Sequence, residues 1–329
     1  MPVSKRSCAS AFCSVGLAVA ACSKPAGQAD SSPATAATSA SISVAPVADR
    51  AQPERRVDPD EPVAAKSIGH TSYVLKVTLA GGAVGVFKPR SRRYLGDRRY
   101  RGEIAAYRLG AALGLDNVPR ATPRAFDAAA LRAACGSTPG NAERFDREAL
   151  VDPDGKLRGA FIDWIDDYRE LPLENADWRA RWEPWLMNPA TQVPKVDLGL
   201  ASAISTMIAF DYLTGNWDRW SGGNVARAGT GALLYVDNDG AFYERPPSDA
   251  LEHQLGVLRR VVRFSRRFVD ALRALDPPKL AAAIGDEEPG APLLPPSVLA
   301  GVEERGRAIL QLVDSRVARL GERAALAFE

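Results

Sequence analysis

The sequence predicts an α+β protein with a strand-rich N-terminal lobe, a helical C-terminal lobe and an unstructured segment in front of both. Apolar residues alternate on either side of a Gly-Gly pair in residues 71–89, which indicates a β-hairpin near the start of the folded part. Apolar residues at helical spacing dominate the chain from Glu252 onward. Residues 23–65 are rich in Ala, Ser, Pro and Thr without any such periodicity, so they are expected to stay disordered.

The first residues have the layout of a secretory signal peptide. Lys5 and Arg6 precede a short apolar run, and small residues follow it. The run is too short to span a bilayer as a stable helix. The stretch "VAAC", which ends at Cys22, is similar to a bacterial lipobox, in which the cysteine is acylated and becomes the first residue of the mature chain. We therefore expect Cys22 to carry the lipid that anchors the protein to a bacterial membrane outside the cytoplasm, with an ordinary signal peptide as the alternative.

These patterns divide the chain into four segments. Residues 1–21 are the expected lipoprotein signal peptide, and residues 22–65 are the expected disordered tether. Residues 66–175 are expected to form the N-terminal lobe and residues 176–329 the helical C-terminal lobe. A folded part of about 260 residues is long enough for one large domain or two closely packed ones.

The composition argues against several kinds of function. A net charge of +2 does not by itself imply a nucleic-acid partner, and none is expected. The chain has only two histidines, which excludes a His-rich metal site and disfavours a Ser-His-Asp triad. Nucleophile-elbow, P-loop and HExxH motifs are absent. If Cys22 carries lipid after the signal peptide is removed, Cys135 has no partner cysteine, so no disulfide framework is expected.

In the N-terminal lobe, the hairpin is followed by a helix and a further buried strand. The return strand of the hairpin ends with Lys88. Residues 98–115 place their apolar side chains on one face of a helix. Residues 127–157 are expected to be a variable insertion, and residues 158–167 predict a buried strand.

The C-terminal lobe begins with a cluster of tryptophans. Trp178, Trp182 and Trp185 have helical spacing, which favours a core position or a seam between lobes over a sugar-binding platform. Residues 197–215 are apolar on most sides and predict a buried helix. Short strands and glycine turns are expected from there to Tyr243.

Five polar residues occur in an order that suits phosphoryl transfer. Taken singly, Lys88 and Glu103 would be surface charges, Asp218 would open an element after a helix stop, and Asn224 and Asp237 would lie in turns. Together they supply a lysine on a strand, a glutamate on a helix, and then Asp, Asn and Asp in a helical lobe. Phosphoryl transfer needs the nucleotide held, its charge neutralised and the nucleophile aimed, and magnesium prefers oxygen ligands.

Two stretches resemble a known family. The sequences "GEIAAYRLGAALGLDNVP" and "FDYLTGNWDR", followed by Asn224 and "YVDNDGAF", are similar to the four-jointed and Golgi casein-kinase group of secretory-pathway kinases. These are atypical protein kinases that phosphorylate Ser, Thr or sugars on exported substrates. The resemblance runs from about Gly69 to Arg267 and implies a bilobal protein-kinase-like fold.

The resemblance also implies a role for each of the five residues. Lys88 would bind the phosphates of ATP, and Glu103 would pair with Lys88 and hold it in place. Asp218 would be the catalytic aspartate. Asp237 and Asn224 would bind the Mg or Mn ion.

The sequence departs from the family pattern at three points. Trp220 stands where many relatives have histidine. Asn224 lies six residues after Asp218 rather than five, and a bulge at the Gly-Gly pair between them is expected to absorb the extra residue. Only Gly69 stands where a glycine loop would cover the phosphates.

The expected function is an ATP- and Mg- or Mn-dependent kinase that phosphorylates a hydroxyl of an extracytoplasmic protein or glycan. A pseudokinase lipoprotein that binds a nucleotide or a partner protein is the first alternative, because ATP is scarce outside the bacterial cytoplasm. A lipid or inositol kinase and a glycan-binding lipoprotein are the others.

Overall fold

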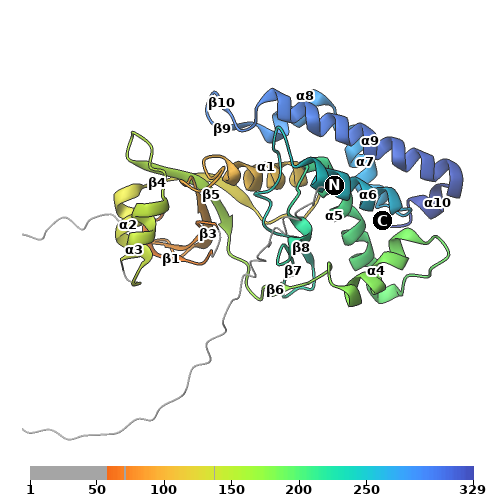
Figure 1. Cartoon of the computed structure of the whole chain (residues 1–329), viewed down its shortest axis with the longest axis horizontal. Coiled ribbons are helices and arrows are strands. Elements are labelled where there is room, and N and C mark those ends of the chain that lie inside the picture. Colours follow the sequence, from red (N-terminus) through yellow and green to blue (C-terminus); the bar gives the residue numbers. More distant parts are fainter. Residues whose placement is uncertain (1–57, 70–71, 137) are drawn as a thin grey trace, which may run out of the picture.

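A computed structural model describes residues 58–69, 72–136 and 138–329. The predicted signal peptide, Cys22 and most of the predicted tether lie outside the described residues. Figure 1 shows two lobes, a sheet with two small helices and a bundle of larger helices, with helix α1 (Arg99–Ala112) between them.

The N-terminal lobe is built on a five-stranded antiparallel sheet with the order β1-β2-β3-β5-β4. Its strands are β1 (Pro62–Ser67), β2 (Leu75–Leu79), β3 (Val84–Pro89), β4 (Ala121–Asp127) and β5 (Lys156–Asp163). The predicted hairpin is β2–β3, and the predicted buried strand is β5. The expectation that the tether extends to residue 65 is wrong, because β1 begins at Pro62 and Ala65 is buried. Small residues give a weak strand signal, and it is pairing with β2 that supplies the hydrogen bonds.

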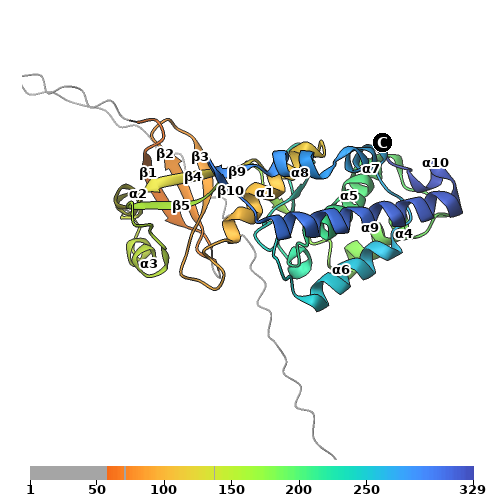
Figure 2. The ribbon, with the colours of Figure 1, turned by 90° about the horizontal axis from the view of Figure 1, so that it is seen from above.

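The two faces of this sheet pack against different partners (Figure 2). One face is covered by α2 (Ala128–Cys135) and α3 (Asn141–Glu148), so the predicted insertion is part of the lobe's core. The other face points toward α1 and the C-terminal lobe. It carries Val86 opposite Ile162 and Lys88 opposite Ala160, and β3 lies in the interior of the sheet.

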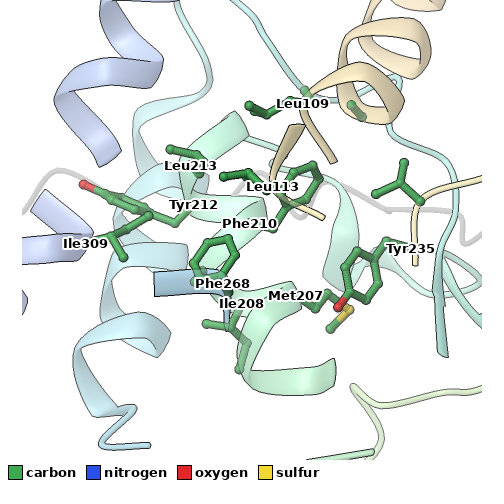
Figure 3. Packing of buried hydrophobic residues seen from close by; sticks show 14 of the residues in the cluster. Leu109, Leu113, Met207, Ile208, Phe210, Tyr212, Leu213, Tyr235, Phe268 and Ile309 are labelled. Carbon is green, nitrogen blue, oxygen red and sulfur yellow. The ribbon is translucent and has the colours of Figure 1, made fainter. Parts of the chain in front are cut away.

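The C-terminal lobe surrounds a central helix, α5 (Leu198–Thr214). Figure 3 shows Phe210, Leu213 and Ile208 of this helix packed among side chains from α1, α7 and α9. Among the described residues, Lys195–Thr214 is long and apolar enough to cross a membrane, but 67% of that window is buried inside the protein. Its composition is therefore explained by its place in the core.

The remaining elements all follow β5 in the chain. They are β6 (Arg169–Glu170), α4 (Ala176–Met187), two 3₁₀ turns (Lys195–Asp197 and Arg219–Ser221), β7 (Val225–Arg227), β8 (Leu233–Tyr235), α6 (Ser248–Arg260), α7 (Arg266–Ala274), α8 (Pro277–Ile284), β9 (Asp286–Glu288), β10 (Ala291–Pro292), α9 (Pro296–Leu320) and α10 (Glu322–Ala325). Strands β6, β7 and β8 form a small antiparallel sheet. This sheet fixes the two loops, residues 215–224 and 236–243, that carry the polar residues of the candidate site.

The tryptophan cluster is part of the core. Trp182 is 1% exposed and Trp185 is buried beside it on α4, while Trp178 packs against the same core from a partly buried position. The indole N–H of Trp182 donates to the carbonyl of Leu173 at 2.9 Å. These side chains therefore do not form an open platform for a sugar.

Candidate active site

Lys88 lies where the two lobes meet. Its Nζ is 2.5 Å from an oxygen of Glu103, 2.6 Å from Asp237 and 3.6 Å from Asp239. Because β3 is an interior strand, its backbone is paired on both sides and the lysine has a fixed base. Burial opposes the charge, but Asp237, Glu103 and Asp239 together hold the pKa of Lys88 well above its usual value, so the ammonium stays charged.

Glu103 connects Lys88 to a loop of the C-terminal lobe. Its Oε1 accepts from Lys88 and also from the backbone N–H of Asn238 at 3.0 Å, and its side chain is 5% exposed. The helix comes close to this loop because residue 102 is glycine. A Cβ on Gly102 would lie 2.6 Å from the carbonyl oxygen of Asn238. Gly102 therefore lets α1 approach the loop at Asn238, and Glu103 next to it accepts a hydrogen bond from that loop.

Asp237 follows β8 and adopts a left-handed backbone conformation, with φ of 56°. One oxygen of its carboxylate contacts Lys88. Its side chain is 43% exposed, so the carboxylate can still accept a further ligand. Burial works against ionisation, but the charges of Lys88 and then Arg99 keep the pKa of Asp237 below its usual value.

Asp218 and Asn224 lie on the neighbouring loop. Asn224 Nδ2 donates to the Asp218 carbonyl at 2.8 Å, which leaves its Oδ1 as the atom available to a metal. Gly222 and Gly223 both have positive φ, as expected if they absorb the additional residue. Burial and then the nearby charge of Asp237 raise the pKa of Asp218, so the two carboxylates are close enough to repel each other.

Arg219 holds these two loops together, a role the sequence analysis did not identify. It is fully buried and donates Nε to Asp211 of α5 at 3.0 Å. Its other nitrogens donate to the carbonyls of Asn224 and Val236 and to Asn238 Oδ1. Arg219 directly follows the predicted catalytic Asp218, but nothing local in the sequence indicates that this arginine is buried.

Asp239 is a further carboxylate that the sequence analysis did not single out. It is 3% exposed, and its Oδ1 accepts from Arg99 Nη2 at 2.6 Å. Burial and then repulsion from Asp237 raise the pKa of Asp239 to about 6. The repeated aspartate in "DND" was the available signal.

A cavity of about 270 Å³ opens beside Lys88. Its lining includes the cations Lys88, Arg93 and Arg99, and hydroxyl groups from Ser72, Ser91 and Tyr94. Gly69 is not among its lining residues. It lies near the start of the connection from β1 to β2, where a Cβ would be 2.3 Å from the Ser72 carbonyl oxygen, so this close approach requires glycine at position 69.

Trp220, one of the three predicted departures from the family pattern, packs into the C-terminal lobe. Its ring stacks on Trp182 at a centroid distance of 5.8 Å, with 21° between the planes. It therefore attaches the Arg219–Ser221 turn to α4, a role in packing that histidine would fill less well.

The structure thus brings Lys88, Glu103, Asp218, Asn224 and Asp237 to one place, whereas Gly69 lies outside this group. No model of a known protein family matches the sequence, and no curated protein matches it. Solved structures do match the fold. A structure of the Golgi casein kinase has a TM-score of 0.59 and 14% identity, covering 81% of this chain and 76% of that chain.

The Golgi casein kinase with Mn/ADP bound has a TM-score of 0.57 and 16% identity, covering 80% of this chain and 74% of that one. For hydra Fam20 with sugar the TM-score is 0.54 and the identity 17%, with 80% and 88% of the two chains covered. The chain has a protein-kinase-like fold. The predicted bilobal α+β architecture is confirmed.

The side chains around Asp237 fit the metal of a kinase-like site. Within the described parts of the chain, no three or more His, Cys, Asp or Glu side chains are arranged to hold a metal ion by themselves. Magnesium is commonly bound by one or two carboxylates together with waters and substrate phosphates. The partly exposed carboxylate of Asp237 and Oδ1 of Asn224 are oxygen donors of that kind, whereas a metal cage made of protein ligands alone does not fit.

Proposed function

We propose that the protein is an ATP- and divalent-metal-dependent kinase that phosphorylates a hydroxyl group of an extracytoplasmic protein or glycan. One observation carries the proposal. The Lys88 ammonium, fixed on an interior strand of one lobe, contacts Glu103 of α1 and Asp237 of the other lobe at 2.5 and 2.6 Å. This arrangement positions a cation for phosphate oxygens next to a carboxylate for a metal ion.

Each residue then has a defined task. Lys88 binds phosphate oxygens of the nucleotide, and Glu103 keeps its ammonium in place. Asp237 and Asn224 would hold Mg or Mn, which would neutralise charge on the phosphates. Asp218 orients the acceptor hydroxyl and accepts its proton, for which its raised pKa makes it a better base than an ordinary aspartate.

The acceptor and the location belong to the same proposal. The lipobox-like "VAAC" supports acylation of Cys22 and anchoring to a bacterial membrane, facing away from the cytoplasm. A substrate protein or glycan would then be met outside the cytoplasm, where the part of the tether before the described residues, 22–57, would give the kinase reach. The Golgi casein kinase and hydra Fam20 structures support the choice of protein and glycan acceptors by analogy of fold alone.

Thermal unfolding of the purified protein with and without ATP and Mg or Mn tests the nucleotide site, because a ligand of the native state raises the melting temperature by mass action. The nucleotide should stabilise the wild type, and Asp237→Asn should lose the metal-dependent part of the shift. Asp314→Asn, on the surface of α9, is the matched control and should keep it.

Transfer of γ-phosphate is then measured on proteins, glycans, lipids and inositol. Stabilisation by nucleotide without transfer to any acceptor would favour the pseudokinase. Transfer to a lipid or inositol alone would favour the lipid kinase. Stabilisation by oligosaccharides but not by nucleotide would favour a glycan-binding protein and refute the kinase.

A further inference from the structure

A small hairpin of the C-terminal half reaches back to the N-terminal lobe. It consists of β9 and β10, which connect α8 to α9. Figures 1 and 2 show it next to α1, at the end of the helical lobe that faces the sheet. Positive φ at Gly285 and Gly290 allows the chain to leave α8 and to turn between the two strands.

Glu287 of this hairpin contacts the first turn of α1. Its side chain is 8% exposed, and its two oxygens have different partners. Oε1 accepts from the hydroxyl of Tyr100, and Oε2 accepts from Arg101 Nε at 2.8 Å. Tyr100 is itself 2% exposed and belongs to the large core, so the carboxylate is held against a fixed partner.

The start of the same hairpin also contacts α1 further along the helix. Arg108 Nη1 donates to the carbonyls of Ile284 and Asp286, the latter at 2.8 Å. Next to Glu287, Glu288 points elsewhere, because it pairs at 2.7 Å with Arg158 of β5 and is half exposed. The hairpin therefore binds α1 on both sides of Glu103, through residues 100–101 and residue 108.

The position of α1 matters because Glu103 makes short contacts with both lobes. It accepts from Lys88 at 2.5 Å and from the Asn238 N–H at 3.0 Å, so a shift of α1 away from both by about 1 Å would stretch them beyond the usual hydrogen-bond range of about 2.7–3.2 Å. In a kinase-like site the Lys–Glu pair must be in place for phosphoryl transfer, and misplacement of this order costs about 100-fold in rate.

We propose that Glu287 is a positioning residue, which clamps α1 so that Glu103 stays paired with Lys88 before any nucleotide or partner binds. The kinase would then be assembled constitutively, without a modification or activating subunit that moves α1 into place. The functional half of this inference rests on the proposed kinase activity, whereas the clamp itself does not.

Three variants of the full chain separate the clamp from general stability. Glu287→Ala removes both contacts to α1, and Glu287→Gln keeps the length of the side chain and one acceptor oxygen. Glu288→Ala on the same hairpin is the matched control, because it removes an exposed ion pair to β5 and leaves α1 untouched. Hydrogen exchange of the amides of α1, compared with those of α5, measures how firmly α1 is held when no nucleotide is present. The kcat for phosphate transfer measures whether loosening α1 slows the reaction.

We expect exchange in α1 to rise about tenfold in Glu287→Ala, less in Glu287→Gln and not in Glu288→Ala, with α5 unchanged. The kcat should fall in the same order. The clamp is overturned if α1 exchanges equally in Glu287→Ala and Glu288→Ala, or if kcat stays at the wild-type value while α1 is loosened. If wild type neither binds nor uses nucleotide, the proposed function fails, and exchange alone still decides whether Glu287 positions α1.

Discussion

Replacing Arg219 by methionine tests how the polar loops are held together. Arg219 is 0% exposed, and its partner Asp211 is 1% exposed. Methionine is also long and flexible but removes the charge, so Asp211 is left buried without its cation. Breaking a buried ion pair from one side costs about 3–5 kcal/mol of the free energy of unfolding. In a domain of this size, that lowers the melting temperature by about 6–20 °C.

The loss should depend on pH, because Asp211 can escape by taking up a proton. Burial raises the pKa of Asp211 to about 6 even with Arg219 in place, against an ordinary value of 3.8. The folded chain therefore binds more protons than the unfolded chain between these values, and the stability due to that proton is lost as the pH rises through about 6. Without Arg219 the pKa rises further, so Arg219→Met should lose more stability at pH ~8 than at pH ~5.

Urea unfolding at the two pH values measures this effect, with Arg305→Met as the control. Arg305 also donates to a carbonyl of α5, that of Leu213 at 2.9 Å. Replacing it leaves no buried carboxylate without its cation, so its effect should not depend on pH in the same way. The double variant Arg219→Met/Asp211→Leu should recover the part of the lost stability that is due to the unpaired Asp211, but neither the part due to the unpaired carbonyls of Asn224 and Val236 nor nucleotide binding. A loss below about 1 kcal/mol at the higher pH, or a double variant no more stable than the single, would refute the reasoning.

Lys88→Met should lower phosphate transfer by about 100-fold or more while the protein stays folded, as measured by γ-phosphate transfer and circular dichroism; equal rates would remove Lys88 from the site. Trp220→Ala should cost about 1–3 kcal/mol in urea unfolding, because it deletes a stacked aromatic pair; an unchanged midpoint would contradict the packing role. Glu148→Gln should destabilise the N-terminal lobe above pH 4.5, since hydrogen bonds from Arg93 lower the pKa of Glu148 to about 2 and that contribution is lost as the pH falls from 4.5 toward 2; a deficit independent of pH over this range would count against it. The kcat should rise with pH through a pKa above the ordinary aspartate range, because burial raises the pKa of Asp218. In Asp218→Asn this rise should vanish together with most of the activity.

Local patterns in the sequence were sufficient to predict the hairpin β2–β3, helix α1 and helix α5. The hairpin is specified by alternation and α1 by helical spacing of apolar residues, whereas α5 is specified by a long stretch that is apolar on most sides. The same kind of signal failed at β1, whose small residues form a strand only because β2 is there to pair with them. The order of Lys88, Glu103, Asp218 and Asp237 along the chain could also be read, because each lies on or after a recognisable element.

The tertiary structure alone decided which charges meet. Lys88 and Asp237 are 149 positions apart, and no local pattern indicates that they are 2.6 Å from each other. Burial of Arg219 and the contact of Glu287 with α1 were invisible for the same reason, since an arginine or glutamate looks solvent-exposed until other elements close around it. The sequence by itself determined the hairpin β2–β3, α1, α5 and the order of the polar residues along the chain. Packing determined which of these groups are removed from water, and therefore which are forced to find a partner.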